Sequence, residues 1–134
     1  MIKTYSLYIS HSWNYDDVLQ DIETLINGRG YFPAKYIQEA KALPICSDLS
    51  WVVKENISRK LEQSDVVLAI SNIFDSDNEW MLWEMDQAKE LGLNVIGIVP
   101  RGQKRISQEV DKRTNVNVPW NGDNIIEAIC RYSK

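Results

Sequence analysis

The sequence is poor in the residues that build metal centres. Its 134 residues include one histidine, His11, and two cysteines, Cys46 and Cys130, which lie far apart and in no paired ligand spacing. We therefore expect no metal site. Cys130 falls in the apolar pattern of the last predicted helix and is expected in the core, whereas Cys46 lies in a predicted loop and is expected to be exposed.

Long apolar runs and charge of one sign are also lacking. The apolar run at residues 66–70 is far shorter than the roughly 20 residues that cross a bilayer, and the first residues include no apolar stretch of a signal peptide. Acidic and basic residues are interspersed at a net charge of -4, with no basic stripe for a phosphate backbone. We predict a cytoplasmic protein that binds neither membrane nor nucleic acid.

The first half of the chain predicts two strands around a helix. Residues 5–10 are rich in aromatic and aliphatic side chains, which is typical of a strand. A helix is predicted next, capped by Asn14 and ended by Gly28, because apolar side chains recur there at helical spacing: Val18, Ile22, Leu25 and Ile26. Residues 31–37 predict a weaker strand, which Pro33 restricts to an edge or a bulge.

The second half continues the alternation of helices and strands. The predicted elements are a helix carrying Trp51, Val52, Ile57 and Leu61, a strand at 66–70, a helix from about 76 to 92, a strand at 94–99, a short helix up to about 111, a strand at 116–118 and a helix beginning at Asn121. Continuous apolar strands indicate a parallel sheet covered on both faces. We predict an α/β, flavodoxin-like, three-layer fold over residues 1–134 as one domain, with the five-stranded order 2-1-3-4-5 and helices on both faces.

In this topology the functional crevice lies outside the carboxyl ends of the first and third strands, where the strand order reverses. The segments that follow these strands are 10–13 and 71–74, both rich in hydroxyl, amide and aromatic groups. Trp80 and Glu84 are four residues apart on the next helix and therefore share a face. An isolated glutamate on a helix is usually solvated, and the neighbouring bulky side chains of residues 80–85 could equally be core filling.

Four runs of sequence together resemble the TIR-like proteins of bacterial Thoeris antiphage systems. They are Leu7-Tyr8-Ile9-Ser10-His11-Ser12-Trp13, Ser71-Asn72-Ile73-Phe74-Asp75-Ser76 followed by Trp80-Met81-Leu82-Trp83-Glu84, Val95-Ile96-Gly97-Ile98-Val99-Pro100, and Pro119-Trp120-Asn121. The resemblance covers nearly the whole chain. It implies that Glu84 is catalytic and that the substrate is bound by six further residues: Ser10, His11, Ser12, Trp13, Phe74 and Trp80.

The resemblance implies cleavage of NAD, with NAD as substrate and no cofactor. The products would be nicotinamide and a cyclic ADP-ribose isomer or ADP-ribose, a second messenger for a downstream effector, and self-assembly or a phage-derived trigger would set the activity. A single carboxylate suits this reaction, because nicotinamide carries a positive charge in NAD and departs neutral without a general acid. An ionised Glu84 would then stabilise the ribosyl cation.

Several alternatives stay open. A non-catalytic adaptor would use the loop at Gln38 to Ser50 for protein contacts, and a receiver-like regulator is disfavoured because Ser10 and Ser71 stand where that class carries acidic residues. Tyr8 is equally suited to a place in the core and to stacking on a base, and His11 is equally suited to ligand contact and to a hydrogen bond at the start of the next helix. Ser76 is at least as well explained as a helix cap.

Overall fold

The computed structural model describes residues 3–11, 18–28, 30–41, 43–70, 79–100, 102–104 and 106–134. They form a five-stranded sheet in the order β2-β1-β3-β4-β5, with every neighbouring pair parallel. The strands are β1 (Tyr5–His11), β2 (Ala34–Ile37), β3 (Val66–Ile70), β4 (Val95–Ile98) and β5 (Val116–Val118). The strand order predicted from the sequence is confirmed.

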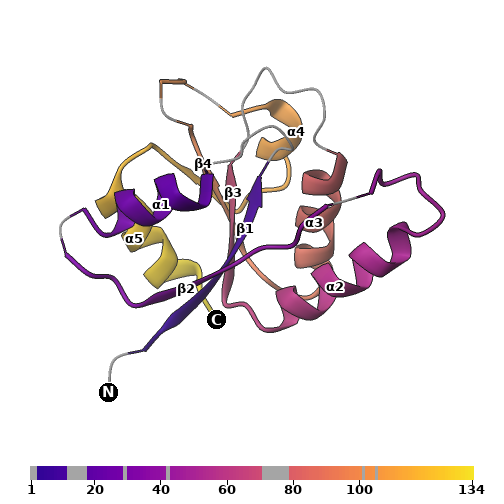
Figure 1. The fold of residues 1–134 in the computed structure, drawn as a ribbon. Coiled ribbons are helices and arrows are strands. Elements are labelled where there is room, and N and C mark those ends of the chain that lie inside the picture. The colour runs from indigo at the N-terminus through magenta and orange to yellow at the C-terminus, as the bar shows by residue number, and fades with distance from the viewer. Residues whose placement is uncertain are drawn as a thin grey trace.

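Helices cover both faces of this sheet, as Figure 1 shows. They are α1 (Val18–Ile26), α2 (Ser50–Glu62), α3 (Glu79–Glu90), α4 (Gln108–Asp111) and α5 (Gly122–Tyr132). Helices α1 and α5 pack on one face, and α2 and α3 pack on the other, each over its own apolar core. The molecule is therefore the doubly covered α/β sandwich that the continuous apolar strands indicate.

Strand β1 divides its side chains between the two cores. Leu7 and Ile9 pack with α1 and α5, whereas Tyr8 packs with α2 and α3. Side chains two apart on a strand share a face, so Ser10 lies on the same side as Tyr8. This alternation places the phenol of Tyr8 and the hydroxyl of Ser10 on the side of the sheet that α2 and α3 cover.

Strand β2 is an edge strand and is shorter than the sequence predicts. It begins only after Pro33, whose carbonyl accepts a hydrogen bond from the Tyr5 amide at 3.0 Å. Proline has no N–H to donate to a ladder, which limits it to the start or the edge of a strand. The edge position was predicted, and the proline sets where the strand begins.

The burial of two helices corrects the sequence analysis. Trp51 and Val52 are exposed, because the buried stripe of α2 follows Ser50, Val53, Ile57 and Leu61 instead. Cys130 is exposed rather than in the core. Each residue turns a helix by about 100°, so Cys130 points away from the stripe that buries its neighbour Ile129.

Cys46 is exposed, as expected from its place in a loop. In the part of the chain that the structure describes, the helices are all too short or too polar to cross a membrane.

Candidate functional site

An acidic side chain, Glu84, is buried in the core between the sheet and the helices α2 and α3. Glu84 has no exposed surface, and it shares the inner face of α3 with four apolar or small side chains, Trp80, Met81, Met85 and Ala88. The stripe that packs α3 against the sheet therefore carries a carboxylate inward. Acidic residues are almost never fully buried unless they are paired, so its partners define the site.

Two hydroxyl groups on β1 hold this carboxylate. The Tyr8 hydroxyl donates a hydrogen bond to Oε2 of Glu84, and Oγ of Ser10 donates to Oε1 at 2.9 Å. Both hydroxyls come from the same face of one strand and both side chains are fully buried. Each carboxylate oxygen thus has a fixed neutral donor on the carboxyl-terminal half of β1.

A cation completes the buried cluster. Nζ of Lys41 lies 3.0 Å from Oε1 of Glu84, and the Lys41 side chain is only 8% exposed. Lys41 belongs to residues 38–41 and 43–49, which we call the β2–α2 connection. The cluster of Tyr8, Ser10, Lys41 and Glu84 is the candidate site, and it joins three separate segments of the chain.

The protonation of this cluster follows from burial and pairing. Burial raises the pKa of Glu84 above its ordinary value, while the Lys41 ammonium and the donors Tyr8 and Ser10 pull the pKa back down. Burial also raises the pKa of Tyr8, and the adjacent Glu84 carboxylate raises it further. The phenol therefore stays protonated and donates to the ionised carboxylate.

The β2–α2 connection is fastened to the elements around the site. The side-chain oxygen of Gln38 lies 3.2 Å from Nε2 of His11, and Nζ of Lys60 donates to the Gln38 carbonyl at 2.9 Å. Further along, Nε1 of Trp80 donates to the Leu43 carbonyl at 2.7 Å. Lys41 is thus carried by a segment bonded to β1, α2 and α3.

The structure brings part of the predicted site together. Ser10 and Glu84 are in direct contact, and His11 follows Ser10 at the end of β1 but contacts Gln38 rather than the carboxylate. Trp80 is buried and holds Leu43. The other predicted residues lie outside the described residues: Ser12, Trp13, Phe74 and Ser76.

Sequence analysis missed two members of the cluster. For Tyr8 it weighed stacking on a base against a place in the core, but not the hydroxyl that reaches Glu84. The signal was present, since Tyr8 and Ser10 are polar groups at alternate positions of an otherwise apolar strand. Lys41 gave no signal, because it lies in a stretch without periodicity.

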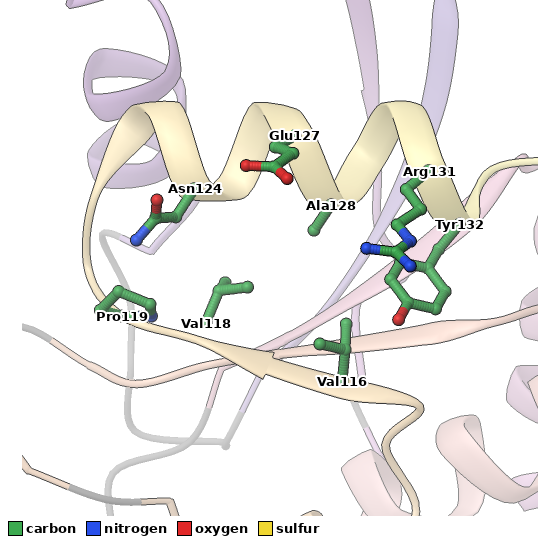
Figure 2. A pocket seen from close by; sticks show the side chains of 8 residues that line it. All are labelled: Val116, Val118, Pro119, Asn124, Glu127, Ala128, Arg131 and Tyr132. Atoms are coloured by element: carbon green, nitrogen blue, oxygen red, sulfur yellow. The ribbon is translucent and has the colours of Figure 1, made fainter.

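A cavity of about 170 Å³ lies elsewhere, between β5 and α5 (Figure 2). Its lining includes Val116 and Val118 from β5 and Glu127 and Arg131 from α5. Ligand pockets typically measure roughly 300–1,000 Å³, so this one is small. In the described part of the chain, no three acidic, histidine or cysteine side chains are grouped to hold a metal ion.

Comparison with known proteins gives structural likenesses only. The chain matches no protein-family model and no curated protein sequence. A 2-deoxyribosyltransferase from Bacillus psychrosaccharolyticus superposes with a TM-score of 0.60 at 16% identity, over 89% of this chain and 90% of that one. The CMP N-glycosidase of Clostridium botulinum gives 0.54 at 9% identity, over 93% and 98%.

A 3-dehydroquinate dehydratase-like protein from Bifidobacterium longum gives a TM-score of 0.53 at 10% identity, over 96% of this chain and 95% of that one. These likenesses establish the shared fold.

The expected membership in the TIR-like proteins of Thoeris systems is wrong, because the similar structures are nucleoside-, nucleotide- and dehydratase-type proteins, not TIR domains. One fold hosts many unrelated functions, so short motifs placed at corresponding points of the fold do not identify a family.

Proposed function

We propose that this chain cleaves the N-glycosidic bond of a nucleoside or nucleotide, with Glu84 as the carboxylate that meets the anomeric carbon. The observation that carries the proposal is a fully buried carboxylate held on both oxygens by Tyr8 and Ser10. Fixed donors orient such a carboxylate before the substrate arrives. A 2-deoxyribosyltransferase and a CMP N-glycosidase with the same fold support this reaction class.

The reaction balances with water as the second substrate. The bond between C1′ and the base nitrogen breaks, and its electron pair departs with the base. The sugar carbon becomes positively charged, and the Glu84 carboxylate stabilises that charge. Water then supplies hydroxide to C1′ and a proton to the base, so the products are the free sugar or sugar phosphate and the free base.

NAD cleavage is a narrower form of this proposal. Among the described residues, Glu84 is the acidic side chain that is fully buried, and its contacts are hydroxyl groups and a lysine rather than a second carboxylate. Ordinary glycosidases use two carboxylates because the leaving group must be protonated. The nicotinamide of NAD leaves as a neutral molecule without being protonated, so one carboxylate suffices. In this form of the proposal NAD is the substrate and no cofactor is required.

The proposal is tested on the full chain with a panel of nucleosides, their 5′-monophosphates and NAD. Free base and sugar products are identified by liquid chromatography and mass spectrometry, which also separates ADP-ribose from a cyclic isomer. Glu84→Gln keeps the shape of the side chain but removes its charge, so we expect base release to fall at least about a hundredfold. Glu90→Gln, an exposed change on the same helix, should leave the rate unchanged.

Base release from no member of the panel would contradict the proposal, as would a Glu84→Gln variant with full activity. The chain would then fit the alternative of a non-catalytic interaction module, with protein contacts through the loop at Gln38 to Ser50. Pull-down with and without substitutions in that loop would distinguish this outcome.

A further inference from the structure

The Lys41 ammonium is buried beside Glu84, and it has N–H donors that form no hydrogen bond among the described residues. It forms an ion pair with Oε1 of Glu84 at 3.0 Å, yet among the described residues it has no hydrogen-bond partner of good geometry. An ammonium carries three N–H donors, and buried donors are normally satisfied. A side chain only 8% exposed therefore offers unused donors directly at the candidate site.

The position of this charge matters for the reaction proposed above. A cation next to Glu84 weakens the field that stabilises a positive sugar carbon, because like charges repel most strongly in a buried site. Glu84 has no exposed surface in this arrangement, and the Lys41 ammonium occupies the position beside its Oε1. A productive substrate must therefore give Lys41 another anion to bind, and a neutral nucleoside has none.

We propose that Lys41 binds the phosphate of the substrate and so selects nucleoside 5′-monophosphates over nucleosides. This inference rests on the proposed function. The ammonium exchanges the Glu84 carboxylate for the phosphate oxygens, which neutralises the cation and leaves Oε1 free to face C1′. A lysine suits this role because it acts as a point charge toward phosphate.

The neighbourhood of Lys41 fits an exchange of partners. Glu39, which lies two residues before Lys41 in the same connection, is already paired with Lys60 at 2.6 Å. It is therefore not a competing partner for Lys41. The connection is held at Gln38 and Leu43, on either side of Lys41, so the lysine can turn without release of the whole segment.

The decisive experiment compares kcat/KM for each nucleoside and its 5′-monophosphate in the full-length chain, in Lys41→Met and in Lys41→Arg. We expect the unsubstituted chain to favour the monophosphate by about 10- to 100-fold, the size of one charge-assisted contact. Lys41→Met should lose this preference, because kcat/KM falls much more for the monophosphate than for the nucleoside, and Lys41→Arg should retain most of it. Lys89→Met removes an exposed charge from α3 and should leave the preference intact.

Equal cleavage of nucleosides and monophosphates by the unsubstituted chain would overturn the inference. So would an equal loss for both substrates in Lys41→Met, since Lys41 would then only position Glu84. A chain that releases base from neither substrate contradicts the proposed function instead. Titration calorimetry with ribose 5-phosphate and with ribose distinguishes that case. Binding of ribose 5-phosphate but not of ribose, lost in Lys41→Met, supports the inference. No binding of ribose 5-phosphate overturns it.

Discussion

At the scale of single residues, the site depends on how a buried carboxylate is kept ionised. Removing a carboxylate from water costs several kcal/mol in a protein interior, and burial accordingly raises the pKa of Glu84. Three contacts act in the other direction: the Lys41 ammonium, the Tyr8 hydroxyl and the Ser10 hydroxyl. Each of them therefore sets the pH range in which Glu84 carries its charge.

Tyr8→Phe tests this balance. The reaction needs ionised Glu84, so activity is present above the Glu84 pKa and is lost as pH falls through it. The Tyr8 hydroxyl donates to the carboxylate and lowers that pKa, so its removal raises the pKa. We expect the acidic limb of kcat/KM for base release to move up by about one pH unit or more.

Tyr36→Phe is the matched control for this shift. Tyr36 lies on the neighbouring strand β2, and its buried hydroxyl has no hydrogen-bond partner among the described residues. Its removal should leave the acidic limb in place. A Tyr8→Phe profile that coincides with that of the unsubstituted chain would show that Glu84 does not govern the limb.

At the scale of elements, two helix starts are fixed by side-chain caps. Ser107 accepts a hydrogen bond from the Val110 amide at the start of α4, and Asn121 accepts one from the Asn124 amide at the start of α5. Such residues satisfy amides that have no partner inside the helix. The start of α5 also meets the end of α1, where the carbonyl of Leu25 approaches Gly122.

Gly122→Ala tests that approach. A Cβ on residue 122 would lie 2.5 Å from the Leu25 carbonyl oxygen, and this oxygen belongs to backbone that cannot turn aside. We expect a loss of about 1–3 kcal/mol in the free energy of unfolding, the usual cost of overpacking, measured by urea denaturation. Glu127→Ala, an exposed change within the same helix, should leave the midpoint nearly unchanged. An unaltered midpoint for Gly122→Ala would mean that α1 and α5 separate without cost.

At the scale of the whole molecule, one sheet joins the two cores. Strand β3 is buried at every position and sends Val67 and Ala69 to one core and Val66, Leu68 and Ile70 to the other. A core cannot be lost on one face while the strand beneath it keeps its packing on the other. Small domains with such shared packing usually unfold in one step.

We therefore expect far-UV circular dichroism and tryptophan fluorescence to give the same urea midpoint. Trp83 packs against the core of α2 and α3, and Trp120 packs against the core of α1 and α5, so fluorescence reports on both faces. A fluorescence transition well before the loss of helix signal would show that the faces unfold separately.

The sequence predicted the architecture better than the site. Continuous apolar strands and helical spacing sufficed for the sheet order, and that order placed Ser10 and the helix of Glu84 near the same edge. Lys41 escaped prediction because its position depends on long-range packing of an aperiodic segment, not on local pattern. The resemblance to TIR-like proteins was misleading because a shared fold does not determine a family, and the similar solved structures are of other classes.

The indole of Trp80 links the candidate site to an observable signal. Its Nε1–H is bonded to the Leu43 carbonyl, close in sequence to Lys41, while its own helix carries Glu84. We expect a displacement of Lys41 toward a bound anion to alter the surroundings of that hydrogen bond, and indole emission is sensitive to such changes in polarity and bonding. In a variant whose other tryptophans are replaced by phenylalanine, the fluorescence of Trp80 would report on the candidate site. The rate of substrate binding could then be measured by stopped-flow without an attached dye.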